Sequence, residues 1–352
     1  MKSDQSSSGS SPNLTRQAIG IAFAALFLWL AFRGANWAQL LHYIKQVNPV
    51  YLLLVCFSGL VSHFLRAVRW VILLRPLTDR KISLWNSFCA VMYGYAVNVV
   101  LPRGGEVARL VSISKTEKLP WAGVLPTMFI DRLLDVALLV LLLGVTLVVF
   151  PTAAFADMKW LVPGGVFLSI GTVVGLLLLP KMGAIIHWVL GCSLVANRLP
   201  ASVKRKVESL AEQFDTGCSS LKSPVAYPAI ALLSIAIWFF YWLNFFLMIQ
   251  AFNLSSQVSA WQCLVVFTIG SVGVLVPTPG SVGSFHFLVQ QGLVFVSGIN
   301  GDQALAFASL LHAICFVAIT CIPAAICFVV QSRSARKEQL AQRLGTSAAV
   351  QE

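Results

Sequence analysis

Residues 98–110 read NVVLPRGGEVARL and interrupt a mostly apolar run that begins near residue 84. One proline and two adjacent glycines predict a break in the helix, because proline lacks a backbone N–H and glycine favours turns. The stretch also carries Arg103, Glu106 and Arg109, where a membrane-spanning helix would hold apolar side chains. It is either the loop by which the chain leaves the membrane or an anion-binding site.

The composition predicts an integral membrane protein. Of the 352 residues, 58% are hydrophobic and 11% are charged, and the mean hydropathy is +0.82. Soluble globular proteins carry about 25% charged residues, and several segments here exceed the roughly 20 apolar residues that cross a bilayer. We therefore predict an all-α polytopic membrane protein.

The net charge of +12 comes from clusters of Lys and Arg that flank the apolar segments. The positive-inside rule accounts for them and predicts a multi-pass protein of the cell (inner) membrane with both termini in the cytoplasm. Attraction to anionic lipid headgroups is compatible with the same pattern. Nucleic-acid binding is not expected, because the clusters build no basic domain. The eight cysteines lie mostly in apolar runs and are predicted to be small buried side chains.

Six segments are long and apolar enough to be full crossings: about 17–34, 50–74, 125–150, 160–180, 226–251 and 303–330. Two further segments, 84–101 and 260–299, are interrupted by Pro and Gly. The charge pattern places the loops 35–48, 151–159 and 252–258 outside. The first interrupted segment then enters and returns from the cytoplasmic side, and the second dips from the opposite face. Each is either a re-entrant hairpin or a pair of spans.

The two halves of the chain are related by a shift of 176 residues. The shift superposes the paired crossings and aligns Ser83 with Ser259, Trp85 with Trp261, Gly94 with Gly270 and Gly104 with Gly280. Opposite predicted orientations make this an inverted-topology repeat, in which matching broken helices indicate a binding site near the midplane of the membrane.

The predicted layout has three parts. A disordered cytoplasmic N-terminus (1–16) precedes one membrane domain (17–330), and a basic cytoplasmic tail (331–352) follows it. Within the membrane domain, the repeat halves are about 50–150 and 226–330, and cytoplasmic connector helices at 181–224 join them.

Crossing 50–74 places Ser58, Ser62, Arg66 and Arg69 on one stripe of a helix, because they are spaced i, i+4, i+8 and i+11. An arginine near the bilayer centre costs about 2.5–3.5 kcal/mol, so such side chains usually face a cavity or a partner. The alternative is that both arginines lie near the cytoplasmic end and snorkel to the interface.

A helix that restarts near Gly105 would point its free N–H groups at an anion above the turn. Arg103 and Arg109 add guanidiniums, whose planar forks suit phosphate oxygens. Glu106 is predicted either to pair with Arg109, three residues on, or to act as a titratable group.

The stretch FIDRLLDVALL (129–139) places Asp131 and Asp135 one helical turn apart, with Arg132 able to pair with Asp135. Carboxylates in the first turns of a helix favour its dipole, which is a purely structural interpretation. They also stand directly before an apolar run, where they can reach the arginines of the other two motifs.

The stretch PTPGSVGSFHF (277–287) breaks the second interrupted segment where the repeat predicts a break. Thr278, Ser281 and Ser284 offer hydroxyl groups, and His286 is the ionisable residue nearby. His63 and His312 are interpreted as core residues.

No nucleotide-binding loop, metal-ligand spacing or nucleophile motif is found, so no catalytic residue, metal or cofactor is expected. The predicted substrate-binding residues are Arg66, Arg69, Asn98, Pro102, Arg103, Gly104, Gly105, Glu106, Arg109, Asp131, Arg132, Asp135, Pro277, Thr278, Pro279, Gly280, Gly283 and His286.

At these motifs the chain resembles the flippase-like family named after the lysylphosphatidylglycerol synthase transmembrane domain. The resemblance runs from about residue 15 to 330, where RAVRW (66–70), LPRGGEVARL (101–110), DRLLD (131–135) and PTPGSVG (277–283) match the family patterns RxxRW, PxRxGExxR, (E/D)RxxD and PTPGGxG in order. That family is similar to the membrane half of multiple peptide resistance factor, which moves aminoacylated phosphatidylglycerol between leaflets. Related domains accompany polyprenyl-lipid glycosyltransferases, so the substrate differs among members.

Two departures from the family pattern stand out. His286 occupies the place where the family commonly has a glutamate, and Ser281 replaces the second glycine of its PTPGG motif. The soluble synthase domain of the two-part enzymes is also lacking, so we expect a stand-alone member that does not make the modified lipid.

The resemblance and the residues together predict a lipid translocase that moves a phospholipid or lipid-linked headgroup through a polar cavity between the two broken hairpins. The expected partners are membrane lipids, with a lipid-modifying enzyme or a second copy of the chain left open. Two alternatives remain: a non-transporting accessory to a lipid-modifying or polyprenyl-glycosyl enzyme, and an intramembrane headgroup transferase.

Overall fold

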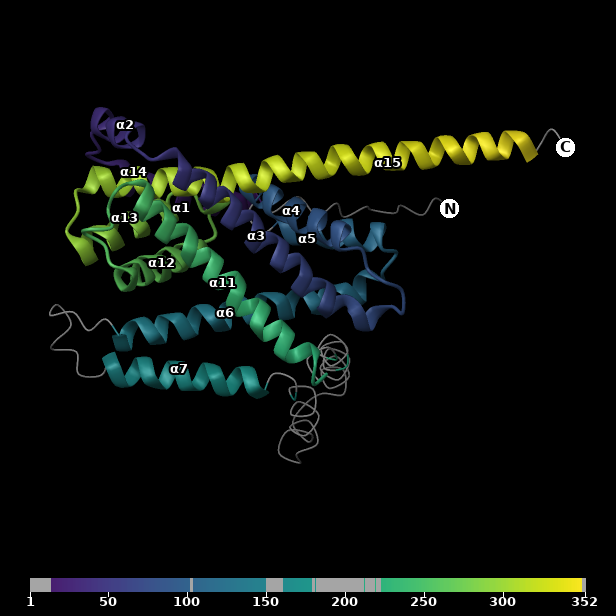
Figure 1. Cartoon of the computed structure of the whole chain (residues 1–352), viewed down its shortest axis with the longest axis horizontal. Helices are drawn as coiled ribbons and strands as arrows, with labels where there is room; N and C mark the ends of the chain where they lie inside the picture. Colours follow the sequence, from purple (N-terminus) through teal and green to yellow (C-terminus); the bar gives the residue numbers. More distant parts are fainter. Residues whose placement is uncertain are drawn as a thin grey trace, which may run out of the picture.

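The computed structural model describes residues 14–101, 104–149, 161–178 and 223–349, with 181, 212 and 219 as isolated positions. Regular secondary structure in these ranges is entirely helical, which confirms the predicted all-α class (Figure 1). Most of the predicted N-terminal segment, the site residues Pro102 and Arg103, and nearly all of the predicted connector lie outside the described residues.

Three helices in the described residues are long and apolar enough to cross a membrane: Pro49–Leu77, Ala226–Ala251 and Gly301–Ser334. The bent pair α1 (Leu14–Phe32) and α2 (Trp37–Lys45) adds a fourth if it is one span. Helix α6 (Trp121–Val149) covers the predicted crossing 125–150, and α7 (Leu161–Leu178) covers most of 160–180. The number of six crossings therefore stays a prediction.

Helix α2 lies within residues 35–48, which were expected to form a loop. The side chain of Asn36 accepts hydrogen bonds from the backbone N–H groups of Ala38 and Gln39 and so caps the helix. The backbone N–H of Asn36 donates to Oδ1 of Asp302 at 3.0 Å, which ties α2 to the start of α14 (Gly301–His312). This capped helix meets α1 at 84°.

Both interrupted segments fold as helix, break and helix. The first contains α4 (Leu84–Val100) and α5 (Gly104–Thr116). The second contains α12 (Ala260–Leu275), the short 3₁₀ turn η5 (Pro279–Ser281) and α13 (Ser284–Ser297). In each segment the two helices pack against each other, and in Figure 1 the first pair lies toward the right and the second toward the left.

Glycine lets α4 and α5 approach closely at the first break. A Cβ added to Gly105 would overlap the carbonyl oxygen of Gly94, whereas nothing lies within 4 Å of a Cβ on Gly171 in α7. We expect Gly105→Ala to lower the thermal unfolding midpoint of the detergent-solubilised protein, because backbone must move to make room. The control Gly171→Ala should leave it unchanged or raise it slightly, since alanine stabilises helix interiors by about 0.5–1 kcal/mol. Equal midpoints for the two variants would show that the α4–α5 contact tolerates separation.

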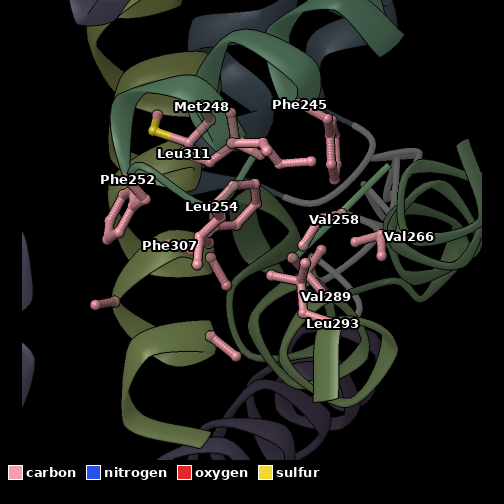
Figure 2. Close-up of a cluster of buried hydrophobic side chains, with 14 of the residues drawn as sticks. Phe245, Met248, Phe252, Leu254, Val258, Val266, Val289, Leu293, Phe307 and Leu311 are labelled. Carbon is pink, nitrogen blue, oxygen red and sulfur yellow. The ribbon is translucent and has the colours of Figure 1, made fainter. Parts of the chain in front are cut away.

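Helices α3 (Pro49–Leu74) and α11 (Ala226–Ala251) pack along each other and run diagonally through the centre of Figure 1. The main apolar core lies beside α11, where α12, α13 and α14 meet it. Figure 2 shows its labelled members, which are Phe245, Met248, Phe252, Leu254, Val258, Val266, Val289, Leu293, Phe307 and Leu311. A second core joins α3 to the first interrupted segment and α6 through Trp70, Met92, Ile113 and Ile130.

The predicted crossing 303–330 begins at Gly301 and contains a π-helical turn, η6 (Ala313–Ala318), between α14 and α15 (Ile319–Ala349). Helix α15 continues through most of the predicted tail and projects from the other helices toward the C-terminus (Figure 1). The tail sequence QSRSARKEQLAQRL holds strong helix formers and no Pro or Gly, so nothing in it ends the helix.

Candidate functional site

Two arginines of α3 lie against two aspartates of α6 inside the helix bundle. The Nη1 atom of Arg66 donates to Oδ2 of Asp135 at 2.7 Å and to Oδ2 of Asp131 at 3.2 Å. The Nη2 atom of Arg69 contacts Oδ1 of Asp131 at 2.7 Å and Oδ1 of Asp135 at 2.8 Å. Spacings of three and four residues put each pair on one helix face. The expectation that the carboxylates reach these arginines is confirmed.

Arg109 of α5 adds a third guanidinium. Its Nη1 atom donates to Oδ2 of Asp131 at 2.8 Å, and its Cζ atom lies 3.7 Å from the centre of the Trp70 ring. Its Nε and Nη2 atoms are buried without a hydrogen-bond partner in the part of the chain that the structure describes. We call Arg66, Arg69, Arg109, Asp131 and Asp135 the arginine–aspartate cluster; three guanidiniums and two carboxylates give it a formal charge of +1.

Each of the four carboxylate oxygens in the arginine–aspartate cluster contacts at least one guanidinium. The arginines were expected to bind phosphate, but here much of their hydrogen-bonding capacity is used by the aspartates. Breaking a buried ion pair by removing one partner costs about 3–5 kcal/mol, because the remaining charge is left uncompensated. The cluster therefore ties α3, α5 and α6 together and holds its arginines in place.

Glu106 pairs with Arg132, and not with Arg109 as the sequence suggested. The Nε atom of Arg132 donates to Oε1 of Glu106 at 2.8 Å. The expected alternative for Arg132, a pair with Asp135, is also wrong, because Asp135 is taken by the two arginines of α3. The Glu106–Arg132 pair is the more accessible of the two ionic groups, with 36% of the glutamate and 41% of the arginine side chain exposed.

A cavity of about 390 Å³ lies between the two interrupted segments, bordered also by α3, α6, α11 and η6. The predicted site residues in its wall are Arg66, Asn98, Glu106, Arg132, Asp135, Pro277, Thr278 and Gly280. The predicted residues that do not line it are Arg69, Arg109, Asp131, Gly104, Gly105, Pro279, Gly283 and His286. Most of the wall is apolar, and the charged groups gather on the side formed by α3, α5 and α6.

The two breaks meet at the cavity. A Cβ added to Gly280 would lie 3.3 Å from both Cα and the carbonyl oxygen of Val99, which places η5 directly against the end of α4. Helix α5 does restart at the Gly-Gly pair, as predicted. Its N-terminus is already capped, however, because Oδ1 of Asn98 accepts a hydrogen bond from the backbone N–H of Gly105 at 2.9 Å.

His286 has a structural position away from the cavity wall. Its Nδ1 atom accepts from the backbone N–H of Gly283 at 3.3 Å, which caps α13. Its ring centre lies 4.6 Å from that of His312 and 6.0 Å from that of Phe32. The Nε2 atom of His312 lies 2.7 Å from the carbonyl oxygen of Gly280, so His312 anchors the second break.

Sequence reasoning missed several cavity residues: His63, Tyr95, Trp238, Tyr241 and Asn244. His63 lies three residues before Arg66 in the same helix, and this spacing was an available signal. Asn244 is an amide inside a 26-residue apolar helix, and polar groups in membrane spans commonly mark functional sites. The aromatic residues gave no signal, because tyrosine and tryptophan are common in membrane helices.

Comparison with known proteins places these features in a wider group. The sequence profile described as the lysylphosphatidylglycerol synthase TM region matches residues 17–322. A UPF0104 membrane protein of Methanocaldococcus jannaschii is 21% identical over 278 residues, which covers 77% of this chain and 82% of the relative. No solved structure matches the chain significantly.

Proposed function

The chain belongs to the lysylphosphatidylglycerol synthase transmembrane family, and from this premise we propose that it is a lipid translocase. It moves a phospholipid or a lipid-linked headgroup between the two leaflets of the cell (inner) membrane. The headgroup passes through the cavity between the two breaks while the acyl chains stay in the bilayer.

The observation that carries this proposal is the cavity at the meeting point of the two breaks. It has charged groups in its wall although the surrounding helices are strongly apolar. Irregular backbone at membrane depth is tolerated where it is covered by protein or lines a water-filled cavity. Its volume of about 390 Å³ lies in the usual range for small-molecule sites and suits a headgroup without its acyl chains.

The wall offers both signs of charge to a headgroup. Arg66 is held by the arginine–aspartate cluster yet lines the cavity, and Arg132 lines it with its partner Glu106. Arginine binds phosphate oxygens well because its planar fork donates several N–H groups. In the proposed bound state, Arg132 turns from Glu106 to the phosphate, and Glu106 is then free to accept from donors on the headgroup.

An inverted repeat with six crossings and two re-entrant hairpins is part of the proposal. Helices α4 and α12 begin at Leu84 and Ala260, which are 176 residues apart, and α3 and α11 begin 177 residues apart at Pro49 and Ala226. Such a repeat gives a transporter two related arrangements, one open to each side. The cytoplasmic termini and a lipid-modifying partner enzyme belong to the same proposal.

The proposal predicts that filling the cavity stops transport. Val99 lines the cavity, whereas the next residue, Val100, is 80% exposed on the outside of α4. In proteoliposomes, Val99→Trp should lower the rate of leaflet exchange of fluorescently labelled phospholipids at least about ten-fold, and Val100→Trp should not. Ten-fold corresponds to about 1.4 kcal/mol.

Thermal unfolding of both variants in detergent separates blockage from misfolding. Exchange that continues at the parent rate in folded Val99→Trp protein would contradict transport through this cavity. Exchange that is absent in the parent protein with every lipid tested would leave the accessory role or the transferase role.

A further inference from the structure

The cavity has a second, uncharged end that the proposed phosphate contacts leave unused. His63 and Asn244 line it, and each is 5% exposed. Both ring nitrogens of His63, Oδ1 of Asn244 and Nε1 of Trp238 are buried without a hydrogen-bond partner among the described residues. Buried polar groups are normally paired, so several orphans around one cavity point to an absent ligand.

These side chains come from two packed helices. His63 lies on α3, and its ring centre is 4.8 Å from that of Tyr95 in α4. Trp238 and Asn244 lie on α11, where the amide nitrogen of Asn244 is 3.7 Å from the position of a Cβ on Gly59. Gly59 precedes His63 by one turn of α3, so the amide and the imidazole face the cavity from adjoining helices.

The free atoms have a mixed and uncharged hydrogen-bonding character. A neutral imidazole offers one donor and one acceptor, Oδ1 of Asn244 is an acceptor, and the indole N–H of Trp238 is a donor. An ammonium group has donors alone and a carboxylate has acceptors alone, so each would leave part of this set unpaired. A hydroxyl group both donates and accepts.

The position of this end relative to Arg66 sets the length of the ligand. His63 and Arg66 are three residues apart, which is about 4.5 Å along a helix. Tyr241 joins the two ends, since its hydroxyl oxygen accepts from Nη2 of Arg66 at 3.1 Å and Tyr241 lies midway between Trp238 and Asn244 in α11. A phosphate at the charged end would therefore place the next few headgroup atoms beside His63 and Asn244.

We propose that His63, Asn244 and Trp238 form a binding subsite for the hydroxyl groups of a polyol headgroup, such as a glycerol or a sugar, that is attached to the lipid phosphate. This rests on the proposed function for its transport role, but the binding it predicts can be measured by itself. The subsite makes the protein select hydroxylated headgroups over apolar ones of equal charge and size.

Two lipids test this selectivity: phosphatidylglycerol and phosphatidylpropanol, which has the same phosphate and three-carbon headgroup without hydroxyls. Each is added to the purified protein in detergent, and the concentration that half-maximally raises the thermal unfolding midpoint is measured. We expect phosphatidylglycerol to act at an at least about ten-fold lower concentration, because phosphatidylpropanol leaves buried polar groups unpaired. Phosphatidylinositol serves as a third arm that distinguishes a ring polyol from glycerol.

His63→Phe and Asn244→Leu remove the polar atoms while keeping similar shapes. In both variants the preference should fall toward one, with phosphatidylpropanol binding unchanged. Equal binding of the two lipids by the parent protein would overturn the proposal and show that the orphaned atoms are satisfied by water alone.

Leaflet exchange of both labelled lipids completes the test. A binding preference without exchange would keep the subsite and overturn the translocase. Exchange of both lipids at one rate, with equal binding, would keep the translocase and overturn the subsite.

Discussion

Replacing Asp131 with asparagine is expected to lower the free energy of unfolding by about 3–5 kcal/mol. Asp131 is fully buried, and its two oxygens contact the guanidiniums of Arg66, Arg69 and Arg109. Asparagine removes the charge and turns an N–H₂ group toward the three cations. The measurement is the loss of folded protein with temperature in detergent, followed by circular dichroism and size-exclusion chromatography.

Two aspartates provide graded controls for this change. Asp135→Asn should destabilise less, because Asp135 contacts two guanidiniums and its side chain is 13% exposed. Asp79→Asn, at an exposed position outside the arginine–aspartate cluster, should have no effect. An Asp131→Asn protein that unfolds like the parent would show that the cluster does not hold α3, α5 and α6 together.

A partial rescue would identify the cause of the instability. The double variant Asp131→Asn, Arg109→Met removes a carboxylate and one of its three partners, so it reduces the surplus positive charge. It should recover part of the stability lost in Asp131→Asn. The stem of methionine can still pack near Trp70, where the guanidinium of Arg109 now lies.

The sequence allowed the convergence of the charged motifs to be predicted, but not their pairing. Spacing along α3 and α6 showed which residues share a helix face, so contact between Arg66 and Asp131 was within reach. Glu106 was assigned to Arg109 because they are neighbours on one helix. In the structure Arg109 points inward to Asp131, and Glu106 is left for Arg132. Local spacing cannot decide between partners on different helices.

His286 shows a second limit of sequence reasoning. Its place beside a broken helix suggested a binding role, yet its ring caps α13 and packs against His312. His63 was interpreted as a core residue and lines the cavity instead. Whether a polar residue faces a core or a cavity depends on how far α3 and α11 separate, and that depends on packing across the whole bundle.

The breaks were predicted more reliably than the residues around them, for a local reason. Proline and glycine end a helix through their own backbone properties, so 101–104 and 276–283 could be read without knowing the neighbours. Their meeting at Val99 and Gly280 followed from the repeat, which is a relation between distant segments of the sequence. The capping of α5 by Asn98 needed the turn geometry and was not foreseen.

Arg132→Gln is expected to lower the leaflet exchange of an anionic phospholipid by about 10- to 100-fold, because a hydrogen bond to a charged group contributes about 1.5–3 kcal/mol. The thermal unfolding midpoint should change little, since the Glu106–Arg132 pair is partly exposed and such pairs add about 0–1 kcal/mol. Exchange is measured in proteoliposomes with lipid labelled on an acyl chain. Arg80→Gln, at an exposed position away from the cavity, is the matched control.

The charge-swapped protein Glu106→Arg, Arg132→Glu separates a binding role from a structural one. The swap keeps an ion pair between α5 and α6, and it keeps one arginine in the cavity wall. If the arginine binds phosphate from either position, exchange should recover partly in the swapped protein and stay low in Arg132→Gln. If Arg132→Gln exchanges lipid as fast as the parent, the pair is a structural contact, and phosphate binding must fall to Arg66. The two outcomes assign the mobile cation of the site, because Arg66 is fixed by two aspartates while Arg132 has a single printed carboxylate partner, Glu106, among the described residues.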